Sequence, residues 1–285
     1  MTNGIFVGLS TVDVIYDVDH FPSANKKVVA LSQDVYVGGP ATNASITFAH
    51  LGGAATLVTA VGRHPLANLV RQELQRYSVR LIDLNPDFDD VPVISSISVN
   101  KAGGRNIISA NATRVTVLPA PPDEAIFKQA SVVLVDGHYM QSCQAWAKAA
   151  HARGIPVVFD GGSWKDGTEE LLRSVDTAIC SADFLPPACA TEDDVLSYLK
   201  KCGVRNIAIT KGSESVRFVS DVGSGVVQVP QVQVADTMGA GDIFHGAFCY
   251  YSSSGLGLVE ALQSATRIAS ESCRFRGTRE WMKSS

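Results

Sequence analysis

Runs of apolar residues alternate along the chain with segments whose apolar residues recur at helical spacing. Short apolar runs at 4–9, 55–61, 131–136, 155–160, 176–180 and 206–210 have the pattern of buried strands. Helical patterns lie between them at 41–52, 66–77, 144–154 and 191–203. Apolar strands that alternate with helices are typical of a parallel sheet covered on both faces. The pattern therefore predicts a doubly wound α/β fold.

Two regions, 14–37 and 92–111, depart from this rhythm. Both contain strands in which polar and apolar residues alternate, and the 101-KAGG-104 turn in the second region predicts a hairpin. Strands of this kind bury only one face, so we expect them to form a small sheet that covers one edge of the main domain. No linker, internal repeat or low-complexity tract interrupts the chain. The expectation is a single domain over 1–285 with the small sheet as a lid.

Composition and charge narrow the classes of partner. The chain has 46% hydrophobic and 18% charged residues and a formal net charge of −4, with no long run of one sign. Nucleic acid and anionic membranes require a basic face, so neither is the expected partner. The six cysteines are scattered, as is typical of reduced intracellular thiols. Asp13 interrupts the N-terminal apolar segment before a signal-peptide core is complete, and no apolar run approaches about 18 residues. We expect a cytoplasmic protein.

The stretch 236-DTMGAGDIFHGAF-248 carries the strongest chemical signal. Small residues, Gly239, Ala240 and Gly241, precede an apolar helical run, so a helix N-terminus there would offer free N–H groups to an anion. Asp242 would lie beside that anion, which suits an acid that takes a proton from a hydroxyl attacking a phosphoryl group. The helix N-terminus is expected to lower the pKa of Asp242. From spacing alone, a capped helix after a tight turn explains the same residues.

Two further stretches suit a polyhydroxylated ligand. In 38-GGPATNAS-45, the glycines permit close approach and Asn43 offers both a donor and an acceptor to a sugar hydroxyl. Asp13 follows the first predicted strand, at the sheet edge where open α/β folds bind ligands. A βα turn and a turn acid are the structural alternatives. The chain lacks GxxxxGK[ST], GxGxxG after the first strand, HExxH and GxSxG, which excludes several other nucleotide-binding and hydrolytic classes.

The 236–248 stretch resembles the DTxGAGD signature of the PfkB (ribokinase-like) carbohydrate kinases. The 38–45 stretch resembles that family's N-terminal signature, in the same order and at a similar separation. The resemblance covers essentially the whole chain, and 7-VGLSTVDVIYDVDHFP-22 and 32-SQDVYVGGPATNAS-45 look closest to ketohexokinase and bacterial sulfofructose kinase. It implies transfer of the ATP γ-phosphoryl group to a sugar hydroxymethyl, with Mg²⁺ and in some members a monovalent cation such as K⁺. A ketohexose or an acidic ketohexose derivative is the substrate that the resemblance favours.

The resemblance also implies roles for individual residues. Asp242 would be the base, and the anion hole would be formed by Gly239, Ala240 and Gly241. The sugar would be held by Asp13, Lys27, Gly38, Gly39 and Asn43. Arg105, after the KAGG turn, would reach the transferring phosphate, or else be a solvated hairpin charge. The nucleotide would be contacted by Thr210, Gly212, Thr237 and Thr266. Asp236 would shape the monovalent-cation loop, as the one candidate metal residue.

The chain departs from the family pattern at several positions. Ser181 and Phe184 replace the amide and acid of an NxxE motif that helps to organise Mg²⁺. Pro40 stands where ketohexokinase has an asparagine, which puts fructose in doubt. His138 lies where sulfofructose kinase has an arginine, and imidazole is a weaker sulfonate partner than guanidinium. The identity of the sugar stays open.

Other interpretations remain at this stage. A nucleoside or phosphosugar kinase of the same fold is one, and a non-catalytic sugar- or nucleotide-binding regulator is another. The half-polar lid strands could pair between two copies of the chain, which suggests a homodimer. His245 is expected to pack in the core, and the basic, aromatic tail 273-CRFRGTREW-281 is expected to be solvated. Trp164 and Lys165 fit a surface loop as well as a phosphate contact.

Overall fold

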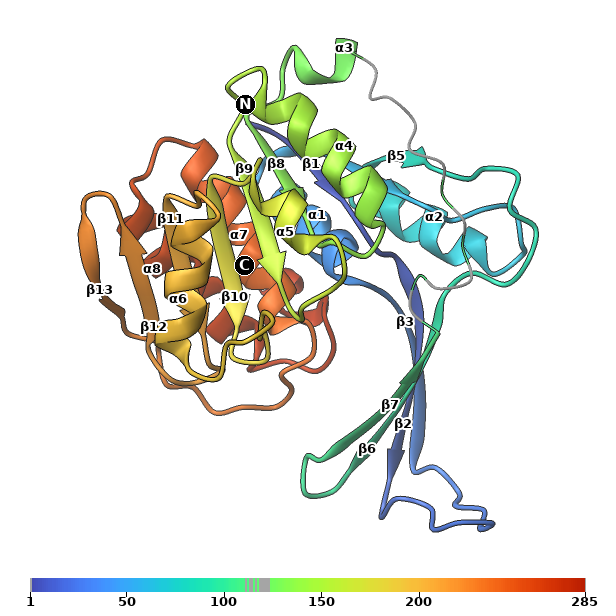
Figure 1. The fold of residues 1–285 in the computed structure, drawn as a ribbon. Helices are drawn as coiled ribbons and strands as arrows, with labels where there is room; N and C mark the ends of the chain where they lie inside the picture. Colours follow the sequence, from blue (N-terminus) through green and yellow to red (C-terminus); the bar gives the residue numbers. More distant parts are fainter. Residues whose placement is uncertain (1, 111, 113–114, 116, 118–123, 285) are drawn as a thin grey trace.

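A computed structural model describes residues 2–110, 112, 115, 117 and 124–284. Its main feature is a nine-stranded sheet in the order β13-β12-β11-β10-β9-β8-β1-β4-β5 (Figure 1). The central strands are β1 (Asn3–Val7), β4 (Ala54–Thr59), β8 (Val132–Val135), β9 (Val157–Gly161), β10 (Thr177–Ser181) and β11 (Asn206–Thr210). At the edges lie β5 (Arg80–Asp83), β12 (Val216–Ser220) and β13 (Gly223–Val227). All pairs from β11 to β5 are parallel, whereas β12 and β13 are antiparallel additions. The predicted doubly wound, mostly parallel sheet is confirmed.

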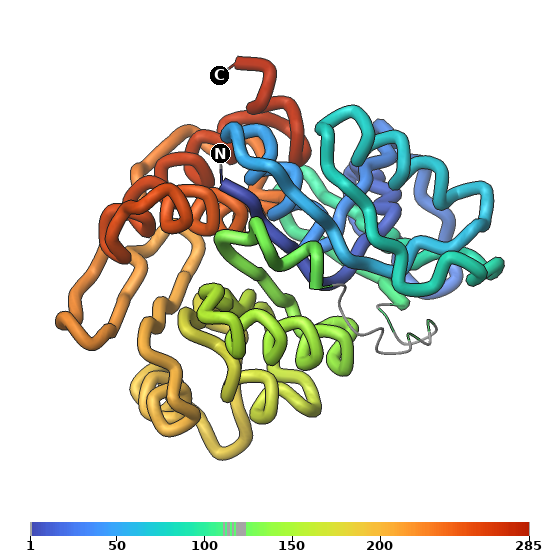
Figure 2. The backbone as a smooth tube through the Cα atoms, turned by 90° about the horizontal axis from the view of Figure 1, so that it is seen from above, coloured from blue at the N-terminus to red at the C-terminus, as the bar shows by residue number. Residues whose placement is uncertain are grey.

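Helices cover both faces of this sheet (Figure 2). One face packs against α1 (Pro40–His50), α2 (Ala67–Arg76), α7 (Ala240–Ser253) and α8 (Leu258–Ser272), and the other against α4 (Met140–His151), α5 (Thr168–Leu172) and α6 (Glu192–Lys201). The alternation of side chains along β1 explains the two cores, because Phe6 enters the first and Ile5 and Val7 enter the second. The short α3 (Glu124–Phe127) and the 3₁₀ helix η1 (Glu280–Lys283) complete the described helices.

The lid is a separate four-stranded sheet in the order β3-β2-β6-β7. It contains β2 (Thr11–Val18), β3 (Ser32–Gly38), β6 (Ile94–Asn100) and β7 (Arg105–Ser109), and the KAGG turn joins β6 and β7 as an antiparallel hairpin. The expectation that this sheet covers one edge of the domain needs correction. The strands extend away from the body, and the loop between β2 and β3 forms the far tip (Figure 1). One consequence is that much of the lid surface is left uncovered by the residues that the structure describes.

The strands that the sequence pattern missed lie at the edges of the main sheet. Each strand predicted there overlaps an observed one, but β5, β12 and β13 were not predicted. β13 has the sequence GSGVV and most of its residues are exposed, so its pattern lacks the apolar run of a buried strand. No helix in the described part of the chain is long and apolar enough to span a membrane.

Candidate active site

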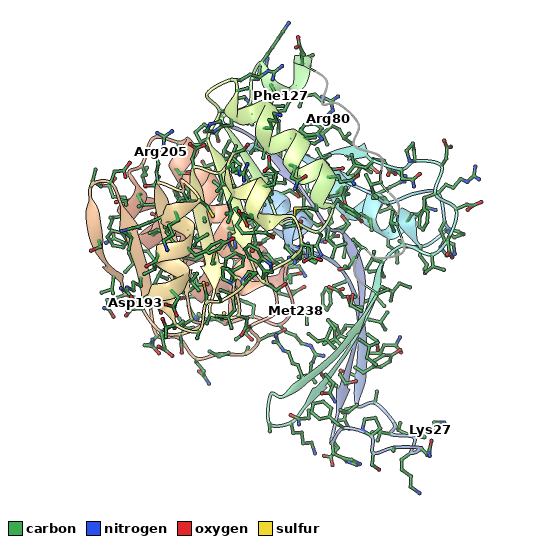
Figure 3. The ribbon with its side chains drawn as sticks, viewed as in Figure 1. Lys27, Arg80, Phe127, Asp193, Arg205 and Met238 are labelled. Carbon is green, nitrogen blue, oxygen red and sulfur yellow. The ribbon has the colours of Figure 1, made fainter. Side chains whose placement is uncertain are left out.

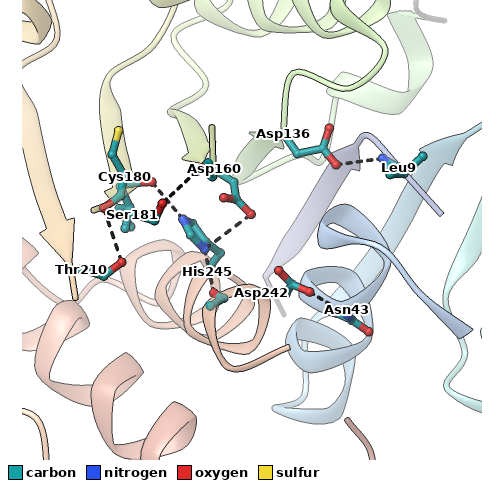
Figure 4. Close-up of polar contacts among 12 residues, drawn as sticks. Leu9, Asn43, Asp136, Asp160, Cys180, Ser181, Thr210, Asp242 and His245 are labelled. Atoms are coloured by element: carbon teal, nitrogen blue, oxygen red, sulfur yellow. Dashed lines mark hydrogen bonds and ion pairs between the residues drawn. The ribbon is translucent and has the colours of Figure 1, made fainter. Parts of the chain in front are cut away.

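The candidate site lies at the carboxyl ends of the central strands, beside β1. The strand order reverses there, because β1 has β4 on one side and β8 on the other. In open α/β sheets such a reversal leaves a crevice in which ligands bind. Asp136, directly after β8, accepts the N–H groups of Leu9 at 2.8 Å and His138 at 2.9 Å and so ties the two strand ends together (Figure 4).

The GAGD segment forms the start of α7 as the sequence predicted. Gly239 caps the helix with φ 65° and ψ 9°, a left-handed conformation that favours glycine. A Cβ atom at Gly239 would lie 2.8 Å from Cγ2 of Thr278, whereas one at Gly241 would have no heavy atom within 4 Å. Gly239 is therefore needed for the turn, and Gly241 leaves open space next to the first helical turn. The N–H group of Ala240 donates to the carbonyl oxygen of Thr237 at 3.3 Å. The N–H groups of Gly241 and Asp242 have no acceptor within the helix, as an anion site requires.

Asp242 lies on this first turn and contacts Asn43 of α1. The Nδ2 group of Asn43 donates to Oδ2 of Asp242 at 2.6 Å (Figure 4). Burial, followed by the nearby charge of Asp160, raises the pKa of Asp242 to about 7, against the opposing effects of the Asn43 bond and of His245. The expectation that the helix N-terminus lowers this pKa was wrong, because burial and a second carboxylate outweigh the helix dipole. A carboxyl group with this pKa suits a general base at neutral pH.

Four of the residues predicted to hold a sugar lie near Asp242. They are Gly38, Gly39 and Asn43 from the 38–45 stretch, and Asp13. Asp13 of β2 lies against Gly38, where any Cβ atom would collide with its carboxylate, and burial raises its pKa. Gly39 has φ 96° and approaches the backbone of Leu9 too closely for a side chain. The charge of Asp13 also acts to raise the pKa of Asp242. Asp13, Asn43 and Asp242 thus form one polar group supplied by the lid, α1 and α7.

A cavity of about 320 Å³ lies on the other side of the α7 N-terminus. Its lining includes every residue predicted to contact a nucleotide, namely Thr210, Gly212, Thr237 and Thr266. Apolar side chains such as Val216, Val229 and Phe244 form much of the remaining wall. Ala240 and Gly241 also line this cavity, so it opens onto the predicted anion hole. The arrangement can hold a flat apolar group at one end and an anion at the other.

The predicted phosphate contact and the predicted metal residue bind each other. Arg105 Nη2 lies 2.6 Å from Asp236 Oδ1, which also accepts the N–H of Met238 at 3.0 Å. The other oxygen, Oδ2, accepts the N–H of Gly277 at 2.9 Å. Asp236 therefore joins the lid, the GAGD loop and the C-terminal tail. Its role towards a metal ion and the role of Arg105 towards phosphate stay predictions.

Lys27 and His138 lie outside the polar group around Asp242. Lys27 is exposed in the loop at the far tip of the lid (Figure 3). His138 follows β8, where burial lowers its pKa and so favours a neutral imidazole. The roles of Lys27 and His138 towards a sugar stay predictions.

The sequence analysis did not identify a buried pair of titratable side chains, His245 and Asp160, that lies behind Asp242. His245, expected in the core and found there, has Nδ1 2.7 Å from the Gly241 carbonyl oxygen and Nε2 3.1 Å from that of Ile179. Carbonyl oxygens only accept hydrogen bonds, so His245 acts as the donor to them. Asp160 Oδ2 lies 3.6 Å from Nδ1, and burial raises the pKa of this carboxyl group (Figure 4). The sequence did offer one signal for this pair, because Asp160 lies at the end of the predicted strand 155–160, where open α/β sheets bind ligands.

The departures from the NxxE pattern have structural explanations. Ser181 Oγ donates to the carbonyl oxygen of Gly162 at 2.8 Å, and Phe184 is buried against Phe159 and Trp164. Trp164 is half-buried and packs against the core beneath α5 and α6. Lys165 Nζ donates to the carbonyl oxygens of Asp136 and Ser163.

The expectation of a solvated C-terminal tail was wrong. Arg279 and Trp281 are only 6% and 2% exposed. Trp281 packs in the core that covers α1 and α7, and Arg279 donates to Asn43 Oδ1 at 2.9 Å. Burial of the tail could not be predicted, because its basic and aromatic residues do not recur at the spacing of a helix or a strand.

Comparison with known proteins agrees with this geometry. A ribokinase from Bacillus subtilis is 25% identical over 284 residues, which cover 96% of this chain and 94% of that protein. The structure of Arabidopsis thaliana ribokinase complexed with ribose and ATP matches with a TM-score of 0.79 at 21% identity, over 100% of this chain and 99% of that one. A putative ribokinase II from E. coli in complex with ATP and Mg²⁺ matches with a TM-score of 0.78 at 18% identity, over 99% and 96%. At these identities the solved structures establish the fold.

The family model described as pfkB family carbohydrate kinase matches residues 1–284. This match spans the lid, the GAGD segment, the cavity beside the α7 N-terminus and the buried tail. The chain belongs to the pfkB family of carbohydrate kinases.

Proposed function

We propose that this protein is an ATP-dependent sugar kinase that transfers the γ-phosphoryl group to a hydroxymethyl group of a sugar. The position of Asp242 carries this proposal. Its carboxylate lies between the Asp13–Asn43 group and the α7 N-terminus, which opens onto the cavity lined by Thr210, Gly212, Thr237 and Thr266. A nucleotide in that cavity would present its terminal phosphate to a sugar held by Asp13 and Asn43.

The reaction then follows from the placement of the groups. The hydroxymethyl oxygen attacks the γ-phosphorus and gives its proton to Asp242, while the bond from that phosphorus to the bridging β-phosphate oxygen breaks and ADP leaves. N–H groups of the first turn of α7 stabilise the charge on the transferring oxygens. Asp13 and Asn43 orient the hydroxyl group, which contributes more than strong deprotonation in a loose transition state.

Mg²⁺ would neutralise part of the triphosphate charge when the nucleotide binds. Within the described ranges, no group of three or more His, Cys, Asp or Glu side chains is arranged to hold a metal ion. We therefore expect phosphate oxygens and water molecules to hold Mg²⁺, as is common for this ion. For K⁺, the Asp236 carboxylate already accepts from Arg105, Met238 and Gly277, so its part is to shape the loop.

The sugar is proposed to be a ketohexose or an acidic ketohexose derivative, with ribose as the competitor that the similar kinases suggest. Charge pairing near the lid bears on this choice. Arg105 pairs with Asp236, and Arg276 pairs with Asp17 and Asp34. An acidic sugar or a phosphosugar would compete with these carboxylates for an arginine, so the pairing favours the neutral ketohexose over its acidic derivative.

A homodimer through the lid strands forms part of the proposal. The edge strands β3 and β7 and the loop before β3 expose Val29, Leu31, Val35, Ile107 and Ile108 to 77%, 61%, 51%, 59% and 78%. Exposed apolar edge strands are prone to pair with another chain. Lys27 lies at the lid tip, so it could contact a sugar only in the site of a second copy. A cytoplasmic location, where ATP is available, completes the proposal.

The test is ADP release with ATP and Mg²⁺ against a panel of sugars. The panel contains fructose, ribose, adenosine, sulfofructose and fructose phosphates, and thermal unfolding is followed in parallel. Turnover with one sugar supports the kinase and names its substrate class. Absence of turnover on the whole panel, combined with stabilisation by a sugar or nucleotide, would favour a non-catalytic regulator instead.

A further inference from the structure

Arg279 lies buried beneath the polar group of Asp13, Asn43 and Asp242, although it comes from the end of the described chain. It directly precedes η1 and is 6% exposed. Its Nη2 donates to Asn43 Oδ1 at 2.9 Å and to the carbonyl oxygen of Val37 at 3.1 Å, and its Nε donates to Glu73 Oε1 at 3.1 Å. The guanidinium group therefore links α2, the end of β3 and the start of α1.

This contact decides which way the Asn43 amide points. A guanidinium group has only donors, so the Asn43 atom facing Arg279 must be the amide oxygen. The NH₂ group then faces Asp242, and its Nδ2 donates to Oδ2 at 2.6 Å. The flipped amide would place an oxygen against the Asp242 carboxylate and an NH₂ group against the guanidinium, which is repulsive at both ends.

The hydrogen bond from Asn43 in turn fixes the orientation of the Asp242 carboxylate, which is proposed to accept the proton. Asp242 Oδ2 is held by Asn43, so Oδ1 is the oxygen that we expect to accept the proton. Glu73 holds the guanidinium from the opposite side, with its carboxylate 19% exposed, so the buried charge of Arg279 is balanced. The contacts thus run from Glu73 through Arg279 and Asn43 to Asp242.

We propose that Arg279 is a positioning residue for the kinase reaction, which fixes the Asn43 amide and through it the Asp242 carboxylate. This inference rests on the proposed function only for its effect on turnover. The geometry also predicts a change that is independent of turnover. Loss of the Asn43 bond should raise the pKa of Asp242, because that bond acts to lower it.

The test is a double-mutant cycle with Asn43→Ala and Arg279→Met, where methionine fills similar space without donors. The pKa of Asp242 is read by NMR of ¹³C-labelled aspartate carboxyl groups, with its resonance assigned as the one lost in Asp242→Asn. We expect each single variant to raise this pKa, and the shift caused by Arg279→Met to be much smaller in the Asn43→Ala background, where only the direct charge of Arg279 on Asp242 is lost. Arg274→Met is the matched control, because Arg274 is an exposed arginine of the same tail that pairs with Glu271.

Turnover provides the second readout of the cycle. With the sugar found in the panel, Arg279→Met should lower kcat by roughly 10- to 100-fold while the KM for ATP stays constant, since only the position of the base changes. If Arg279→Met does not fold, Arg279→Lys replaces it, because one ammonium group cannot bond Glu73, Val37 and Asn43 together.

Two results would overturn the proposal. One is an Asp242 pKa that does not change in Arg279→Met or Arg279→Lys. The other is an Arg279→Met shift that remains in full in the Asn43→Ala background, which would mean that Arg279 acts by its charge alone. If no sugar is turned over, the proposed function fails, yet the NMR titration still decides the role of Arg279.

Discussion

Asp242 shows how one residue acquires properties from distant parts of the chain. Its position at a helix start follows from the local sequence and was predicted. Its pKa of about 7 depends on burial and on Asp160, which lies on β9. Sequence reasoning considered only the helix N-terminus and so gave the opposite direction. Local sequence can identify the base, but its basicity depends on contacts between elements.

A pH profile should report this raised pKa. Asp242 must be deprotonated to accept a proton, so kcat/KM should fall as pH decreases through about 7, with a slope of one proton. An aspartate with an ordinary pKa near 3.8 would leave activity constant down to about pH 5. Steady-state rates between pH 5 and 9 check this, with coupling enzymes in excess. A flat profile from pH 5 to 7 would contradict the assignment.

The same raised pKa should cost stability at high pH. The folded protein keeps the Asp242 proton up to about pH 7, whereas the unfolded chain loses it near 3.8. The free energy of unfolding therefore decreases as pH rises between these values. Asp242→Asn should raise Tm at pH 8 by roughly 2–5 °C and much less at pH 5. Calorimetry at both pH values measures this, and an equal shift at both would argue against burial as the cause.

At the scale of elements, the start of α7 depends on two glycines that have different roles. Gly239 has φ 65° and lies against Thr278, and Gly241 faces open space. The sequence predicted both as anion-hole residues. Only the structure separates them, because the contact with Thr278 joins positions far apart in the chain.

Alanine at each glycine should give different defects. Gly239→Ala should lower Tm by roughly 2–5 °C, since a left-handed residue with a side chain costs about 1–2 kcal/mol. Gly241→Ala should leave Tm unchanged or slightly higher and instead lower kcat/KM for ATP, because its methyl group enters the space in front of the N–H groups. Thermal unfolding and ATP kinetics of both variants test this. A greater loss of stability in Gly241→Ala than in Gly239→Ala would refute it.

At the scale of the whole molecule, the lid has an apolar surface that is exposed in one copy of the chain. Its strands and hairpin were predicted from alternating polar and apolar residues, but its direction was not. The direction of the lid strands depends on the angle between β1 and β2, which the pattern of apolar and polar residues does not indicate. The exposed apolar side chains of β3 and β7 leave a surface that a second copy could cover.

Lysine substitutions on the lid should disrupt the proposed dimer. Light scattering after gel filtration should give a dimer mass for the wild type and a monomer mass for Val35→Lys combined with Ile108→Lys. Val222→Lys is the matched control, because Val222 is 91% exposed in the turn between β12 and β13. A wild type that is monomeric at micromolar concentration would exclude this dimer.

The sequence predicted the fold more completely than the site. Buried strands and their helices follow from hydrophobic period. The GAGD and GGPATN stretches identified Asp242 and Asn43, and Asp13 was identified by its place after the first predicted strand. The buried contacts of Asp160, His245 and Arg279 were missed as parts of the site, since each involves partners on distant elements. The cavity lined by Thr210, Gly212, Thr237 and Thr266 was anticipated only through the family resemblance.

The most direct test of the account is the rate of phosphoryl transfer in Asp242→Asn. It is measured in a single turnover with the sugar that the panel identifies, beside Asp221→Asn as an exposed aspartate control. The account predicts a fall of roughly 10²- to 10⁴-fold for Asp242→Asn, with binding of sugar and ATP retained and the control unaffected. A variant that transfers phosphate within a few-fold of the wild-type rate would show that Asp242 is not the base.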